Sequence, residues 1–233
     1  MEEKRTQIKT TKRIRTVCSA LEKCVKFADV GCDHGYCTAY MLENGLCESA
    51  QISDVSDKCL AKAEKLLCEF IAEGRVKSVC CDGLTGIDRD TDLVLIAGMG
   101  GEEIIKILEE GFLPDKLLLQ PMKNTEKVRK FLIGKGYELF CDCTFFADGK
   151  FYDLIKAERT GRSENYSELM LRYGKDNLFS PSADFLKKLE RDIRNCEQWL
   201  VSANSDSKQR LESLMSELKE IYDETQGNLR GDR

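Results

Sequence analysis

Apolar and polar positions alternate along residues 26–158 in a regular rhythm of short apolar runs and longer amphipathic stretches. The short runs predict strands, and the longer stretches, whose apolar residues recur at helical spacing, predict helices. Strands are expected near residues 26–30, 49–54, 75–80, 92–97 and 116–120, with helices near 35–45, 57–72, 101–110 and 124–135 between them. This alternation predicts a parallel sheet that is covered by helices on both faces.

The pattern changes at both ends of this region. Apolar residues at helical spacing predict an N-terminal helix over residues 4–24, and two final strands near 137–145 and 150–158 are joined at the tight-turn dipeptide Asp148-Gly149. An antiparallel last strand favours the methyltransferase variant of the Rossmann plan over a nicotinamide dehydrogenase. From Pro181 two amphipathic stretches predict a helical hairpin, which resembles a coiled coil. We therefore expect an α/β, Rossmann-like class I methyltransferase domain over residues 1–160 and a helical hairpin domain over residues 161–233.

Charge is distributed unevenly along the chain. The 233 residues carry 36 Lys and Arg against 41 Asp and Glu, a formal charge of −5 that does not indicate a nucleic-acid binder. Residues 1–27, however, hold eight basic residues against three acidic ones, so a basic segment precedes an acidic body. Such a segment contacts phosphates or forms a solvated helix face. No apolar run of about eighteen residues is present, so we expect no membrane span.

Twelve cysteines are compatible with reduced thiols in the cytoplasm, because we find neither a signal peptide nor the C-x-x-C spacing of zinc and redox sites. Cys141 and Cys143 share a face of a predicted strand, and packing is favoured over metal binding there. With His34 as the single histidine, we expect no metal site.

Small and acidic residues follow the predicted strands. The strand Phe27–Val30 contains Asp29 and runs into the turn Gly31-Cys32-Asp33-His34-Gly35, and a second acid, Asp54, ends the next strand. Because the carboxyl ends of parallel strands line one crevice, these residues form one surface, where glycine permits close approach of a nucleotide-like ligand. Carboxylates disfavour a pyrophosphate, whereas they suit the sulfonium, ammonium and ribose of S-adenosylmethionine. Each acid taken singly has a surface or capping role as its alternative.

Three motifs carry a resemblance to a known family. They are Asp29-Val30-Gly31-Cys32-Asp33-His34-Gly35-Tyr36, Ile96-Ala97-Gly98-Met99-Gly100-Gly101 and Leu119-Gln120-Pro121, with further similarity at Lys12-Arg13-Ile14, Asp82-Gly83-Leu84 and Phe151-Tyr152-Asp153. The chain resembles bacterial tRNA (adenine-N1) methyltransferases that modify adenine 22. It departs from the family pattern at Cys32, where Ser is usual, at Asp54, where Glu is usual, and at Met122, where Asn is expected.

The resemblance implies roles for individual residues. Asp54 holds the ribose hydroxyls, Val55 packs on the donor adenine, Asp82 reaches its exocyclic amine, and Asp29 and Asp33 orient the amino-acid end. The remaining expected cofactor-binding residues are Gly31, His34, Gly83, Ala97 and Gly98, with S-adenosylhomocysteine as the product. Expected tRNA-binding residues are Lys9, Lys12, Arg13, Arg15, Gln120, Pro121 and Tyr152.

Adenine N1 carries a free lone pair, so its methylation requires positioning and desolvation rather than a general base. Gly98, Met99 and His34 are the expected positioning residues. Helix capping is the alternative for His34, and core packing is the alternative for Tyr152. We expect methylation of N1 of a tRNA adenine by a cytoplasmic monomer or weak dimer. The alternatives are a small-molecule methyltransferase, which requires no RNA, and a non-catalytic RNA-binding module, whose RNA binding survives Asp54→Ala.

Overall fold

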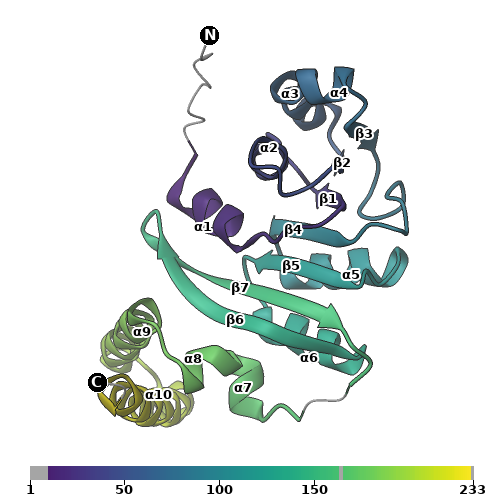
Figure 1. Cartoon of the computed structure of the whole chain (residues 1–233). Coiled ribbons are helices and arrows are strands. Elements are labelled where there is room, and N and C mark those ends of the chain that lie inside the picture. The colour runs from purple at the N-terminus through teal and green to yellow at the C-terminus, as the bar shows by residue number, and fades with distance from the viewer. Residues whose placement is uncertain (1–9, 163–164, 232–233) are drawn as a thin grey trace.

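A seven-stranded sheet of order β3-β2-β1-β4-β5-β7-β6 forms the centre of the computed structural model, which describes residues 10–162 and 165–231 (Figure 1). Strands β1 to β5 pair in parallel, and β7 is antiparallel to both β5 and β6. The Rossmann-like sheet and its antiparallel last strand are thereby confirmed. The strands are β1 (Lys26–Val30), β2 (Ser49–Asp54), β3 (Val76–Cys80), β4 (Leu93–Met99), β5 (Lys116–Pro121), β6 (Tyr137–Ala147) and β7 (Lys150–Arg159).

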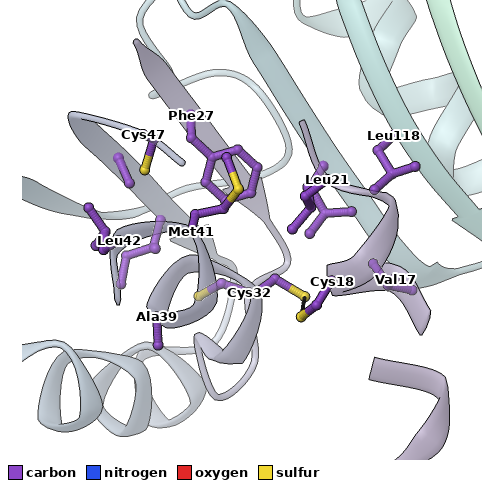
Figure 2. Packing of buried hydrophobic residues seen from close by; sticks show 14 of the residues in the cluster. Val17, Cys18, Leu21, Phe27, Cys32, Ala39, Met41, Leu42, Cys47 and Leu118 are labelled. Carbon is purple, nitrogen blue, oxygen red and sulfur yellow. Dashed lines mark hydrogen bonds between the residues drawn. The ribbon is translucent and has the colours of Figure 1, made fainter. Parts of the chain in front are cut away.

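Helices cover both faces of the sheet because successive side chains of a strand point to opposite faces. In β4, Leu93 and Leu95 join one apolar cluster, and Val94 and Ile96 join another. The first cluster packs against α1 (Lys12–Ala20), α2 (Tyr36–Glu43), α3 (Asp57–Leu66) and α4 (Cys68–Ala72), and the second against α5 (Gly101–Glu110) and α6 (Thr125–Gly134). Figure 2 shows Val17 and Cys18 of α1, and Leu21 directly after this helix, in the first cluster.

The N-terminal helix ends earlier in the chain than its apolar spacing predicts. It begins after Thr11, whose hydroxyl accepts a hydrogen bond from the backbone N–H of Ile14, and it ends at Ala20. The chain then becomes extended at Leu21, and the N–H of Cys24 donates to the carbonyl of Leu46 at 2.9 Å. Pairing with the segment before β2 therefore replaces the last predicted turn. Residues 4–9 of the prediction lie outside the described residues.

The C-terminal part contains two helices that the sequence pattern did not predict. These are α7 (Glu168–Tyr173) and α8 (Lys175–Phe179), whose six and five residues are too few to show a helical period. Helices α9 (Ala183–Leu200) and α10 (Ser205–Gly231) form the expected hairpin around Phe185, Leu189 and Ile221. The α7–α8 segment packs on β6, where the side-chain oxygen of Asn177 accepts from the N–H of Thr144 at 2.9 Å. The domain boundary near residue 160 stays a prediction.

Candidate functional site

Two adjoining hollows lie at the carboxyl ends of β1, β2 and β4, where the strand order reverses. The larger hollow, of about 570 Å³, is bounded by α1, the turn after β1, the start of α2 and the β6–β7 hairpin. The smaller hollow, of about 250 Å³, lies against the ends of β2, β3 and β4. Both are lined by Arg13, Gly31, Asp33 and Ala97. A strand-order reversal is the usual position of a ligand crevice in an open α/β sheet.

The turn after β1 leaves its backbone open to this crevice. Gly31 and Gly35 have φ values of 70° and 71°, and Asp33 has a φ of 47°, all in the left-handed region that favours glycine and tolerates aspartate. The N–H groups of Gly31 and Cys32 both donate to the carbonyl of Ser53, at 2.8 and 3.0 Å. The turn is therefore fastened to the end of β2 and presents small residues to both hollows.

Asp29 is a buried acid in the wall of the larger hollow. Its Oδ2 accepts a hydrogen bond from the hydroxyl of Thr38 on α2 at 2.9 Å. Burial raises the pKa of Asp29 to about 6, and the nearby carboxylate of Asp54 adds to the rise, against the lowering effect of the Thr38 hydrogen bond. The carboxylate therefore gains from a cation in the hollow, because a positive charge favours its ionised form.

Asp54 presents a fixed carboxylate in the smaller hollow. Its Oδ1 accepts from the N–H of Ser56 at 2.8 Å, and its Oδ2 accepts from the N–H of Asp33 at 3.3 Å. Each oxygen retains acceptor capacity, which suits two vicinal hydroxyls. Val55 follows with 68% of its surface exposed, an apolar face in a hollow that Asp82 and Gly83 also line. This combination fits the adenosine part of a nucleoside ligand.

The end of β4 brings backbone rather than polar side chains to the crevice. Ala97, Gly98 and Met99 all line the smaller hollow, and a register shift lies between Ala97 and Met99. Gly98 has a φ of 83°, a conformation that favours glycine. The carbonyl of Met99 accepts from the N–H of Met122 at 2.8 Å, so this loop is held to the segment after β5. No side chain from Ala97 to Gly101 offers a strong acceptor to a substrate.

Arg13 occupies a position that the sequence did not reveal. The basic segment suggested a surface phosphate contact, whereas the Arg13 side chain lines both hollows and its Nη1 donates to Oε1 of Gln120 at 2.7 Å. Its guanidinium carbon lies 6.0 Å from the ring centre of Tyr152, which lines the larger hollow. The contact joins residues 107 positions apart, and periodicity carries no signal for it.

The other predicted positions are distributed around the crevice. His34 lines the larger hollow, and its ring stacks on that of Tyr36 with centroids 5.4 Å apart. Lys12 and Arg15 are exposed on α1 outside both hollows, and Lys9 lies outside the described residues. Pro121 is buried at the end of β5 and lines neither hollow. Lys12 and Arg15 therefore lie outside the hollows that the acids line.

Asp148 is a site residue that sequence reasoning recognised only as part of a turn. Its carboxylate accepts from the N–H groups of Lys12 and Arg13 at 3.3 and 3.0 Å, and it lines the larger hollow. These hydrogen bonds and the nearby Arg15 charge hold the pKa of Asp148 below its usual range, the Arg13 N–H bond contributing most. Figure 1 shows the β6–β7 turn beside α1. The hairpin turn therefore caps the helix that carries Arg13.

The described residues contain neither a metal cluster nor a membrane-spanning helix. Within residues 10–162 and 165–231, no group of three or more His, Cys, Asp or Glu side chains is arranged to hold a metal ion. None of the described helices combines the length and the apolar character that crossing a membrane requires. The acids, the exposed valine and the glycine turns together fit S-adenosylmethionine better than a dinucleotide, whose pyrophosphate would meet Asp29, Asp33 and Asp54.

Comparison with known proteins decides between these ligand classes. A family model described as a methyltransferase domain matches residues 10–155. The chain belongs to this methyltransferase family. The methyltransferase is also 29% identical over 236 residues to the tRNA (adenine(22)-N(1))-methyltransferase of Bacillus subtilis, with 93% of this chain and 98% of that protein covered. This confirms the resemblance that the motifs indicated.

Solved structures agree with the assignment. Sp1610 of Streptococcus pneumoniae, in complex with S-adenosyl-L-methionine, superposes on this methyltransferase with a TM-score of 0.81 and 25% identity, covering 91% of this chain and 99% of that chain. The Bacillus subtilis m1A22 tRNA methyltransferase TrmK gives a TM-score of 0.77 at 24% identity, with coverage of 93% and 100%. The second likeness shows that the fold extends through the helical hairpin.

Proposed function

We propose that this protein transfers the methyl group of S-adenosylmethionine to N1 of an adenine in tRNA, adenine 22, in the cytoplasm. The observation that carries the proposal is the pair of hollows around Arg13, Gly31 and Ala97, one suited to a nucleoside donor and the other open beside it. The Bacillus subtilis relative, which bears the name of this reaction, supports the choice of substrate.

Residues of both hollows would hold the donor. Asp54 would accept hydrogen bonds from the ribose hydroxyls, Val55 would pack on the donor adenine, and Asp82 would accept from its amine. Asp29 and Asp33 would attract the cationic amino-acid end. When bound, the donor supplies an electrophilic methyl group on a sulfonium.

The reaction requires little acid or base chemistry from the chain. As the adenine N1 lone pair bonds to the methyl carbon, the carbon–sulfur bond breaks and its electron pair stays on sulfur. No proton is transferred, and the product base is a cation. The glycine-rich segment Gly98-Met99-Gly100-Gly101 leaves room for a base and places no basic side chain against it. Positioning and exclusion of water would then supply the rate enhancement.

Recognition of tRNA would begin at the mouth of the crevice. Lys12 and Arg15 are exposed on α1, and Lys150 lines the larger hollow from the hairpin. Lysine and arginine side chains supply the phosphate contacts that give proteins their affinity for RNA. A volume of about 570 Å³ is also within the range of small-molecule sites, so a small-molecule acceptor is the second candidate.

Incubation with tritiated S-adenosylmethionine and unmodified tRNA, followed by nucleoside analysis, tests the proposal. We expect label in 1-methyladenosine, and we expect Asp54→Ala to weaken donor binding by about 10-fold to 100-fold because charge-assisted hydrogen bonds are lost. Asp90→Ala is the matched control, since Asp90 is an exposed acid that pairs with Lys26. Donor binding without transfer to tRNA would favour the small-molecule acceptor, and RNA binding that is unaffected by Asp54→Ala without any transfer would favour a non-catalytic module.

A further inference from the structure

The orientation of the Gln120 side-chain amide is determined by its hydrogen-bond partners, which include Sδ of Met122, 3.5 Å from Nε2. The residue is fully buried at the end of β5. Its Nε2 donates to the carbonyl of Pro121 at 3.1 Å, and its Oε1 accepts from Nη1 of Arg13 at 2.7 Å. Because a donor and an acceptor lie at opposite ends of the amide, a flipped amide would lose both hydrogen bonds. The acceptor end therefore points toward the side chain that lines both hollows.

Gln120 lines neither hollow, and its acceptor lies on the strand next to Gly98, one of the expected positioning residues. Gln120 pairs in register with Ala97, the residue before Gly98 at the end of β4. A Cβ atom placed on Gly98 would lie 3.4 Å from Nη1 of Arg13, so the guanidinium covers this part of the crevice. Arg13 is only half-buried and reaches Gln120 from α1, a separate element. A half-exposed cation can leave Gln120 for a phosphate, which offers it a stronger, charge-assisted hydrogen bond.

We propose that Oε1 of Gln120 accepts a hydrogen bond from the exocyclic amine of the target adenine, and that Arg13 moves from Gln120 to an RNA phosphate when this base enters. The proposal rests on the proposed function and names the residue that selects the base. The amine of adenine is bonded to the carbon next to N1, so the group that recognises it must lie near the methylated nitrogen. Guanine carries a carbonyl oxygen at that position, and two acceptors would face each other.

Charge and stacking support the same arrangement. Methylation at N1 makes the base cationic, which strengthens a hydrogen bond from its amine to a neutral acceptor and disfavours a guanidinium in contact with it. The departure of Arg13 also uncovers one face of Tyr152, whose ring centre lies 6.0 Å from the guanidinium carbon. An aromatic ring beside the crevice offers a stacking surface to a base that has left its helix.

The test compares two substrates and two forms of the full-length enzyme. One substrate is the unmodified tRNA, and the other is the same tRNA with purine, which lacks the amine, at the target position. Purine lowers the intrinsic reactivity of N1 for both enzymes, so the ratio of the two kcat/KM values is compared between wild type and Gln120→Met. We expect the ratio of kcat/KM for adenine to kcat/KM for purine to be about tenfold higher in wild type than in Gln120→Met, because the variant loses one hydrogen bond.

Matched variants distinguish recognition from general damage. Gln51→Met removes another buried glutamine, whose Oε1 accepts from the N–H of Asp88, and should leave the adenine preference unchanged. Arg13→Met should raise KM for both tRNAs equally, because Arg13 acts on phosphate rather than on the base. Gln120→Glu retains an acceptor and should retain the preference even if Gln120→Met folds poorly.

Three results would overturn the inference. An adenine preference that is the same in wild type and Gln120→Met would show that Gln120 does not recognise the amine, and loss of the preference in Gln120→Glu would have the same meaning. A changed preference in Arg13→Met would contradict the movement to phosphate. Each of these leaves the proposed function intact, whereas a wild-type enzyme that binds the donor and methylates no tRNA would overturn both.

Discussion

Asp29 has a burial, a hydrogen-bond partner and a pKa in the folded protein that its position in the sequence does not reveal. In the sequence it is an acid near the end of a strand, whereas in the fold it is buried, accepts from Thr38 and lines the larger hollow. Burial raises its pKa to about 6, above the 3.8 of an ordinary aspartate. Within the native protein a substantial fraction of Asp29 is therefore protonated in mildly acidic solution.

We expect donor affinity to decrease as the pH falls through about 6. The cationic donor favours ionised Asp29, so binding lowers the pKa of this carboxyl and releases a proton. Above about pH 7 Asp29 is already ionised and affinity becomes level. Calorimetry in buffers of different ionisation enthalpy measures both quantities, and Asp29→Asn should abolish the proton release. Persistence of the release in Asp29→Asn, with Asp90→Asn as control, would show that another group titrates.

At the scale of elements, the β6–β7 hairpin and α1 act together. The Asp148 carboxylate accepts from two N–H groups at the start of α1, and the same helix carries Arg13 into the crevice. Thr11 caps the helix from within its own segment, through the N–H of Ile14 at 3.3 Å. Asp148 therefore serves less to form the helix than to hold it against the hairpin.

Asp148→Gly should reduce kcat/KM for tRNA by about tenfold or more, because α1 and Arg13 would no longer be held in position beside the crevice. Glycine tolerates the φ of 49° at this position, so the change removes the carboxylate without backbone strain. The change should also lower the free energy of unfolding, because a helix cap is lost. Asp148→Asn retains an acceptor and should restore most of the activity. Equal activity of Asp148→Gly and the control Asp115→Ala, an exposed acid paired with Arg159, would contradict this role.

At the scale of the whole molecule, a buried ion pair connects the sheet to the C-terminal helices. Arg129 of α6 is fully buried, and its Nε donates to both carboxylate oxygens of Asp142 on β6 at 2.7 and 2.9 Å. Its Nη1 donates to the carbonyls of Leu171 and Arg172 at 3.0 and 3.2 Å, near the end of α7. One side chain thus joins α6, β6 and the segment that leads to the helical hairpin.

Arg129→Met should lower the free energy of unfolding by about 3–5 kcal/mol, because the Asp142 carboxylate stays buried without its partner. Denaturant unfolding measures this change. Arg172→Met is the matched control, since its pair with Glu217 is partly exposed and should contribute about 1 kcal/mol or less. The double variant Arg129→Met, Asp142→Leu should recover part of the loss. A cost for Arg129→Met no larger than that of Arg172→Met would show that the pair does not connect the two regions.

The sequence by itself determined that the chain forms a mostly parallel sheet and in which order the strands and covering helices follow one another along the chain. It also determined the acids and glycines at the strand ends. These are local properties: strand and helix periods are visible in apolar spacing, and a parallel sheet brings its carboxyl ends to one edge. The identities of Asp54, Val55 and Gly98 as crevice residues follow from that rule and agree with the hollows observed.

Only the tertiary structure decided which distant residues meet. The contacts of Arg13 with Gln120, of Asp148 with the start of α1 and of Arg129 with α7 join elements that are not neighbours in the chain. The type of each residue determines which hydrogen bonds its side chain can make. Which partner the side chain meets depends on how the chain packs in the folded protein. The short helices α7 and α8 belong to the same category, because their docking on β6, rather than a helical period, makes them recognisable.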